Sequence, residues 1–152
     1  MTDLTGLRLA MPEDAQAISN LAKAAYERYV PVMNAIPLPM SADYSAHIAD
    51  DTVLVLDGGD GLDASLVLME RSDHLYIWSI AVCPKAQGKG LGGKLMSHCE
   101  ALARGKGLSE IRLFTNVFMR ENQAWYRRQG FVETGEEQIG DKRIVHFVKR
   151  LG

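Results

Sequence analysis

Hydrophobic residues follow two different spacings along the 152-residue chain, and each spacing predicts a different kind of element. Short runs rich in β-branched and aromatic residues indicate strands, whereas apolar residues at every third or fourth position indicate helices with one buried face. The runs that predict strands are Leu7–Ala10, Thr52–Leu56, Ala64–Glu70, His74–Val82, Ile111–Thr115, Phe131–Thr134 and Arg143–Val148. The order β-α-α-β-β-β-α-β-α-β-β predicts an α/β fold of the α+β type, in which a mixed, mostly antiparallel sheet carries helices on both faces.

Proline, glycine and capping residues set the expected ends of the helices. The first helix is expected to open at Pro12–Asp14, where acidic side chains favour the positive end of the helix dipole, and to stop at Pro31. The segment Pro31–Met40 predicts a loop, which either packs on the core or forms a wall or lid beside a substrate. Ser41 is expected to cap a short helix that ends near Asp50. The later helices are expected over Leu91–Ala103 and Glu121–Gln129.

Composition and charge exclude several classes of function. The chain has the size of one ordinary domain, so we expect a single domain over residues 1–152. A net charge of −2 lacks the positive footprint of a general nucleic-acid-binding protein. No apolar run reaches the length of a membrane span and no secretory signal pattern is visible, so we expect a cytoplasmic protein without nucleic-acid or membrane partners. Cys83 and Cys99 fit no metal or redox spacing, so we expect free thiols and no metal site.

The glycine-rich stretch AQGKGLGGKL, residues 86–95, fits three phosphate-binding patterns. It contains G-x-G-x-x-G, the dinucleotide pattern; G-x-x-x-x-G-K, most of a nucleotide-binding P-loop; and Q-x-x-G-x-G, the pyrophosphate loop of an acetyltransferase. All three direct backbone N–H groups toward a phosphate at the start of a helix. Because they imply different chemistry, the rest of the chain must distinguish them.

Two of the three patterns lack a residue that their chemistry needs. A P-loop requires Ser or Thr after the lysine to hold Mg²⁺, but this position is Leu95, and the acidic Asp57 precedes the loop in a predicted hairpin. A dinucleotide fold requires an acidic residue at the end of the next strand, which here ends at Thr115-Asn116. Both patterns are therefore disfavoured.

The third pattern is supported by a second motif. The string SIAVCPKAQGKGLGGKLM resembles the central motif of the GNAT superfamily of N-acetyltransferases. ENQAWYRRQGF resembles the helix that follows in that family, with Tyr126 four residues before the terminal Gly-Phe. The resemblance covers Leu75–Phe131 directly. It implies six or seven strands with splayed central strands, use of acetyl-CoA, and acetylation of a small-molecule amine or a peptide N-terminus. Homodimers are common in the family, so a homodimer is one expected assembly.

The resemblance also implies which residues contact the cofactor. In the family, the glycine loop holds the pyrophosphate of coenzyme A, and the cofactor arm pairs like an extra strand with the end of SIAV. The expected cofactor-binding residues are Ile80, Ala81, Val82, Gln87, Gly88, Lys89, Gly90, Leu91, Gly92, Gly93, Asn122 and Tyr126. Met119 stands where many relatives carry an asparagine, so positioning of the arm by that side chain is not expected here.

Tyr126 is the expected proton donor. The leaving group of acetyl transfer from a thioester is a thiolate, and a phenol with an ordinary pKa of ~10 stays protonated at neutral pH and can supply that proton. The alternative for Tyr126 is an aromatic side chain packed under its helix.

The general base is the main departure from the family. Many relatives carry a glutamate on the strand before the I-A-V run, but Tyr76–Ser79 contains no carboxylate. The candidates are Glu70, Asp73 and His74, and we take Glu70 as the expected base. Trp78 is either a wall of the acceptor site or a core residue. The missing glutamate keeps an alternative open, a non-catalytic CoA- or acyl-CoA-binding sensor on the same fold.

Overall fold

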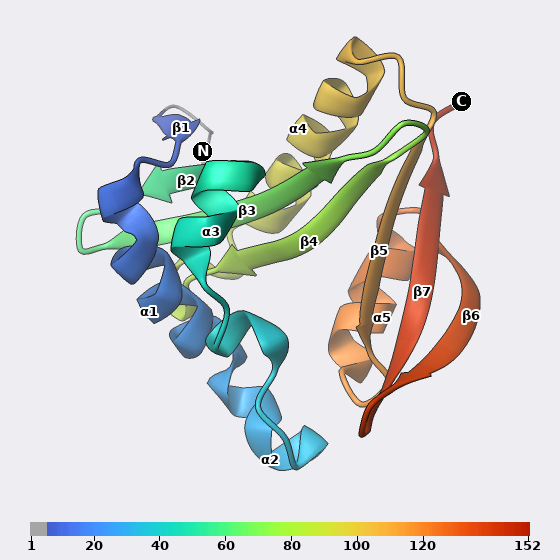
Figure 1. The fold of residues 1–152 in the computed structure, drawn as a ribbon, viewed down its shortest axis with the longest axis horizontal. Coiled ribbons are helices and arrows are strands. Elements are labelled where there is room, and N and C mark those ends of the chain that lie inside the picture. The colour runs from blue at the N-terminus through green and yellow to red at the C-terminus, as the bar shows by residue number, and fades with distance from the viewer. Residues whose placement is uncertain (1–5) are drawn as a thin grey trace.

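A seven-stranded sheet organises the computed structural model, which describes residues 6–152 (Figure 1). The strands lie in the order β1-β2-β3-β4-β5-β7-β6, and every neighbouring pair is antiparallel except β4 and β5. Their bounds are β1 Leu7–Leu9, β2 Thr52–Asp57, β3 Leu62–Glu70, β4 Leu75–Val82, β5 Glu110–Asn116, β6 Val132–Ile139 and β7 Lys142–Arg150. The predicted mixed, mostly antiparallel sheet is confirmed.

Helices cover both faces of this sheet and bury two separate cores. The α-helices are α1 Ala15–Tyr26, α2 Val30–Met33, α3 Tyr44–Asp50, α4 Leu91–Gly105 and α5 Arg120–Arg128. Leu91, Leu95 and Tyr126 contribute to the core under α4 and α5, whereas Ile18 and Tyr44 contribute to the core under α1–α3. Within residues 6–152, no helix combines the length and apolar character needed to cross a bilayer.

The segment after α1 is more helical than predicted. Pro31 does not end the helical segment: it lies in the first turn of α2, where the missing N–H of proline has no intrahelical partner to lose. The chain turns away at Asn34, which adopts a left-handed conformation with φ of 51°. The predicted loop therefore contains α2 and a 3₁₀ turn, η3, at Leu38–Met40. Ser41 is not the cap of α3 either, because the Asp43 carboxylate accepts the Ala46 N–H at 3.2 Å.

The two C-terminal strands are longer than predicted. The hydrophobic pattern indicates only residues 131–134 and 143–148, but β6 and β7 pair from Val132↔Val148 to Ile139↔Lys142. β6 is an edge strand with most of its side chains in solvent, so its polar sequence VETGEEQI carries no alternating hydrophobic pattern.

Strands β4 and β5 separate soon after they begin, as Figure 1 shows. Only Leu75↔Ile111 and Tyr76↔Arg112 pair between them. The rest of β4 is hydrogen-bonded only to β3 in the sheet, so its other edge is open. The splayed central strands implied by the family resemblance are therefore present.

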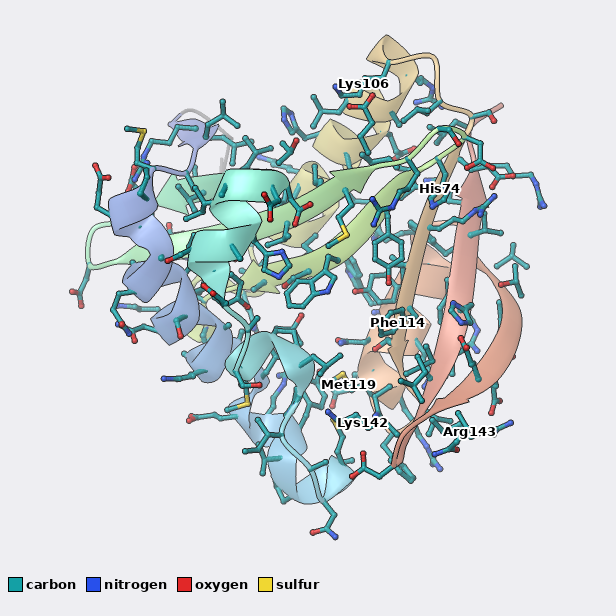
Figure 2. The ribbon with its side chains drawn as sticks, in the orientation of Figure 1. His74, Lys106, Phe114, Met119, Lys142 and Arg143 are labelled. Carbon is teal, nitrogen blue, oxygen red and sulfur yellow. The ribbon has the colours of Figure 1, made fainter. Side chains whose placement is uncertain are left out.

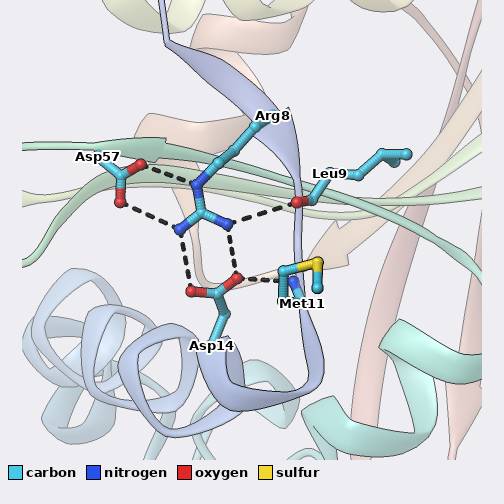
Figure 3. Close-up of polar contacts among 5 residues, drawn as sticks. All are labelled: Arg8, Leu9, Met11, Asp14 and Asp57. Carbon is cyan, nitrogen blue, oxygen red and sulfur yellow. Dashed lines mark hydrogen bonds and ion pairs between the residues drawn. The ribbon is translucent and has the colours of Figure 1, made fainter.

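A charged contact links β1 to the end of β2 and to the turn before α1 (Figure 3). The Arg8 guanidinium donates to both carboxylate oxygens of Asp14, at 2.8 and 3.0 Å, and to those of Asp57, at 2.8 and 3.2 Å. Asp14 also accepts the Met11 N–H at 2.7 Å. The bond from Arg8, followed by the bond from Met11, lowers the pKa of Asp14. One side chain thus joins β1, the end of β2 and the turn before α1.

We expect Asp14→Asn to lower the melting temperature at neutral pH. Folding lowers the pKa of Asp14, so its stabilising contribution is full above the unfolded pKa of about 3.9 and is lost as pH falls through the folded pKa. The difference in melting temperature from the wild type should therefore be present at about pH 5 to 7 and shrink below about pH 4. Circular dichroism melts measure it. Asp60→Asn is the control, since its contact with Lys85 is solvent-exposed and should contribute little. A difference for Asp14→Asn that stays constant down to pH 3 would contradict this account.

Candidate functional site

A cleft of about 400 Å³ lies where β4 leaves β5, and we call it the main cleft. It is bordered by the open end of β4, the glycine-rich loop, the start of α4 and the inner face of α5. The predicted site residues that line it are Ile80, Ala81, Val82, Gln87, Gly88, Gly90, Leu91, Gly92, Gly93, Asn122 and Tyr126. Lys89 is exposed and does not line it. The structure thus brings together residues from three separate parts of the sequence.

The glycine loop enters α4 through a backbone shape that favours glycine. Gly88 and Gly90 have φ of 80° and 77°, in the left-handed region, and a Cβ at either position would meet no other atom within 4 Å. The Lys94 N–H donates to the Gly90 carbonyl at 3.2 Å, and the preceding N–H groups of the first turn have no intrahelical acceptor. With the positive end of the helix dipole, these groups suit an anion.

The open edge of β4 directs its polar backbone groups toward the main cleft. The Ile80 carbonyl accepts the Tyr26 hydroxyl at 3.3 Å, and the Val82 carbonyl accepts the Gln87 side-chain amide at 3.0 Å. In a strand, the N–H and C=O of one residue point to the same edge, and alternate residues repeat this direction. The N–H groups of Ile80 and Val82 therefore also point into the space that a neighbouring strand would occupy.

Tyr126 places a phenol at the inner end of the main cleft. Its ring packs against Trp125, Phe131 and Phe147, with centroids 5.4, 5.9 and 6.0 Å away. Burial, followed by the neighbouring phenols of Tyr26 and Tyr29, raises its pKa far above the ordinary value, so the hydroxyl stays protonated at neutral pH. Among residues 6–152, no hydrogen bond engages this hydroxyl, and no fully buried side-chain oxygen is left unpaired. The hydroxyl is therefore accessible from the cleft.

Residues from the first helical segment complete the main cleft, and the sequence motifs did not indicate them. Tyr26 ends α1, Tyr29 ends the 3₁₀ turn η2 (Glu27–Tyr29), and both lie beside the cleft with Arg28. The Tyr29 hydroxyl donates to the Asn122 side-chain oxygen at 3.2 Å, which links this segment to α5. Helical spacing identified the buried face of this helix, but spacing alone does not show that its last turn borders a cleft.

The predicted base does not meet the other site residues. Glu70 ends β3 opposite Leu75 and pairs with Lys106 at 3.1 Å. Ile80 lies opposite Leu66, and at about 3.3 Å per residue this places Glu70 roughly 13 Å farther along β3. Asp73 and His74, which pair with each other at 2.7 Å, lie at the same end of the sheet. Figure 2 shows His74 and Lys106 at the end opposite Met119 and Lys142.

A smaller cavity of about 70 Å³ adjoins the main cleft, and we call it the side cavity. The two share the residues Tyr26, Ile80, Asn122 and Tyr126. Trp78 lines the side cavity because a β-bulge gives it no partner on β3: Val67 pairs with Ser79, and Leu68 pairs with Ile77. Neither space is lined by a carboxylate or a histidine within residues 6–152.

The geometry also disfavours the nucleotide-binding patterns. Leu95 is fully buried in the core under α4, so no polar group stands at the position where a P-loop holds Mg²⁺. Asp57 is paired with Arg8 and does not line the main cleft. Glu110 begins β5 and pairs with Arg112 at 2.8 Å, away from the end of that strand.

Comparison with known sequences identifies relatives over the part of the chain that builds this site. The model of the "Acetyltransferase (GNAT) family" matches residues 46–131. The L-2,4-diaminobutyric acid acetyltransferase of Vibrio parahaemolyticus is 32% identical over an alignment of 95 residues, which covers 58% of this chain and 51% of the relative. The amino-acid acetyltransferase of Neisseria meningitidis is 32% identical over 98 residues, 64% of this chain and 21% of the relative. The chain spans about half or less of these curated relatives.

Solved structures share the fold over nearly the whole chain. The ribosomal-protein-S18-alanine N-acetyltransferase from Escherichia coli superposes with a TM-score of 0.75 at 16% identity, covering 96% of this chain and 93% of that one. The PaiA N-acetyltransferase from Thermoplasma acidophilum, in complex with coenzyme A, superposes with a TM-score of 0.73 at 16% identity, covering 95% and 97%. At these identities the likeness concerns the fold.

We expect Gly90→Ala to destabilise the protein, because alanine at a φ of 77° enters the left-handed region. The free energy of unfolding in urea should fall by about 1–2 kcal/mol. Gly105→Ala at the other end of α4 is the matched control: its Cβ would meet no atom and its φ is not left-handed. The free energy of unfolding of Gly105→Ala should be unchanged or rise by about 0.5–1 kcal/mol. Equal losses in the two variants would mean that the backbone shape at Gly90 is not the cause.

Proposed function

The chain belongs to the acetyltransferase (GNAT) family, and we propose that it is an acetyl-CoA-dependent N-acetyltransferase that acts on a primary amine. The observation that carries the proposal is the main cleft, in which a glycine loop at a helix start, an open strand edge and a buried phenol meet. Names of relatives, diaminobutyric acid and amino-acid acetyltransferase among them, support an acceptor with a free amine. A small-molecule amine or a peptide N-terminus fits this description.

The main cleft fits coenzyme A at its phosphate end. Free N–H groups at the start of α4, together with left-handed Gly88 and Gly90, form an anion cradle without side chains in the way. Arg28 and Lys94 supply positive charge nearby: Arg28 lines the cleft, and Lys94 lies in the first turn of α4. When bound, acetyl-CoA supplies an acetyl group activated as a thioester.

The open edge of β4 fits an extended, amide-bearing arm. Ile80 and Val82 offer N–H and C=O groups in the pattern that a paired strand would use. Near the junction of the two spaces, an N–H of this edge stabilises negative charge as it develops on a carbonyl oxygen, which lowers the barrier to attack. Asn122 and Tyr126 face this edge across the cleft.

Tyr126 holds a proton at the junction of the main cleft and the side cavity. Transfer forms one C–N bond and breaks one C–S bond. The thiolate gains a proton, and the nitrogen loses one N–H proton as the amide forms, which restores the proton given up by the donor. The raised pKa of Tyr126 keeps its hydroxyl protonated at neutral pH, so a donor is in place beside the thiolate as that leaving group forms. Its position beside Ile80 and Asn122 makes it the donor in our proposal.

The amine must be neutral before it attacks. Because no carboxylate or imidazole within residues 6–152 lines either space, we assign the lost proton to water and leave Glu70 out of the proposed chemistry. The same observation favours one alternative, a CoA- or acyl-CoA-binding sensor on this fold. Such a protein would bind the cofactor and transfer nothing.

Binding and transfer are tested together. Calorimetry and thermal melting with acetyl-CoA and CoA should give saturable binding and a higher melting temperature, since ligands that bind only the folded state stabilise it. A panel of primary amines, assayed by release of the CoA thiol, should then identify acceptors. No binding at saturating cofactor would overturn the proposal. Binding without transfer to any amine would favour the sensor.

We expect Tyr126→Phe to lower kcat with little change in CoA affinity. The variant keeps the ring that packs against Trp125, Phe131 and Phe147 and removes only the proton donor. General acid catalysis is worth about 10²- to 10⁴-fold, and the loss should lie in this range if chemistry limits turnover. Steady-state kinetics with calorimetric titration of CoA measure both quantities. An unchanged kcat would remove Tyr126 from the acid role.

A further inference from the structure

The wall of the side cavity has an apolar part, beside polar residues that include Ser79, Thr115 and Asn116. The apolar residues that line the side cavity are Met33, Pro37, Leu38, Trp78, Phe114 and Met119. Pro37 is among the most deeply buried residues of the protein. Because the side cavity shares Tyr26, Ile80, Asn122 and Tyr126 with the main cleft, a molecule held there reaches the proposed site of transfer. At about 70 Å³ the side cavity has room for a short apolar group of an acceptor, while the rest of that molecule would lie at the junction with the main cleft.

Lys142, at the start of β7, is the one charged side chain that lines the side cavity in the described part of the chain. It is half-buried, and its Nζ donates to the Ile36 carbonyl at 3.2 Å. Figure 2 shows Lys142 near Met119 in the space between β7 and α2. Within residues 6–152 it forms no ion pair with a carboxylate, in contrast to its neighbour Arg143, which pairs with Glu136 at 2.6 Å. The ammonium of this cavity-lining residue thus has only a neutral acceptor, the carbonyl of Ile36, which does not itself line the cavity.

This charge distribution discriminates between acceptors. A molecule that carries further positive charges would meet Lys142 and no carboxylate to balance them. A molecule that carries a carboxylate would form a charge-assisted hydrogen bond with Lys142, stronger than the present bond to a neutral carbonyl. Lys142 can exchange one acceptor for the other by moving only its own flexible side chain.

We propose that Lys142 binds the carboxylate of the acceptor, and that the acceptor is a small amino acid with an apolar side chain. The inference rests on the proposed acetyl transfer, and it names a specificity residue that the sequence motifs do not contain. The acceptor amine is directed toward Tyr126 while its carboxylate is held at Lys142. Polyamines, which carry several positive charges and no carboxylate, are disfavoured by the same arrangement.

Matched pairs of acceptors test the proposal. Alanine, valine and leucine are each compared with the corresponding amide, which keeps the amine and the side chain and removes the negative charge. The wild type should prefer the acid in kcat/KM by about tenfold or more, the scale of a hydrogen bond to a charged group. An amide acceptor has the more weakly basic amine and is more often neutral, so chemistry alone would favour it. A preference for the amide, or none, would overturn the proposal.

Three variants test whether Lys142 causes the preference for the acid. Lys142→Met should abolish this preference, mainly by raising KM for the acids, and should leave kcat/KM for the amides nearly unchanged. Lys142→Arg should retain most of the preference. Arg143→Met is the matched control, because Arg143 does not line the side cavity and should keep the preference. Thermal melts check that each variant folds. A preference that persists in folded Lys142→Met would assign the carboxylate to another group.

A binding readout separates this inference from the proposed function. If no acceptor of the panel is acetylated, acids and amides are titrated by calorimetry into the CoA-saturated wild type and Lys142→Met. Tighter binding of the acids that is lost in the variant supports the role of Lys142 without any turnover. Equal binding of acids and amides overturns it, even where CoA binds normally. Failure of CoA itself to bind overturns the proposed function instead.

Discussion

The separation of β4 from β5 is the constraint on which the rest of the site depends. A strand inside a sheet normally satisfies its backbone on both edges, but β4 keeps β5 as a neighbour over only two residue pairs. The remaining edge needs partners, and side chains from α1 and the glycine loop supply two of them. Because these partners are single hydrogen bonds and not a strand, an extended ligand can take the open edge without unfolding the sheet. The large aromatic residues of α1, α5 and β4 then fill the space around that ligand site.

The N-terminal helical segment contributes more to the site than its distance in sequence suggests. Tyr26 and Tyr29 cross the separation and contact β4 and α5, so the wall of the cleft comes from both halves of the chain. Burial beside these phenols raises the pKa of Tyr126, and the same packing that stabilises the fold also keeps a proton at the junction. At the far end of this segment, the contact of Lys142 with Ile36 ties the start of β7 to the wall of the side cavity. The residues that pack this region are therefore the same ones that take part in the proposed chemistry.

Much of the fold and the core of the site were predictable from sequence, because they follow from local rules. Alternating and helical hydrophobic spacings located the strands and helices. The two motifs predicted residues that the structure brings together in the main cleft, among them Gly88, Ile80 and Tyr126. The failures have physical causes. The first turn of a helix tolerates a proline, so Pro31 did not end the helical segment. An edge strand such as β6 has no buried face, so its sequence shows no alternating hydrophobic pattern. Glu70 was one of three candidates that the sequence could not rank, and sheet register places it at the end of β3 away from Ile80. Lys142 lies in no motif, so only the fold brings it to the cavity.

The contact between Gly92 and Trp125 joins the glycine loop to the helix of Tyr126. A Cβ at position 92 would lie 3.1 Å from the Trp125 ring, closer than ordinary contacts allow. Glycine here follows from the bulk of a neighbour and not from backbone conformation, since Gly92 is not left-handed. The two positions are therefore coupled. Shortening residue 125 would leave room for a side chain at position 92, whereas with tryptophan present a Cβ there requires the ring to shift by a few tenths of an ångström.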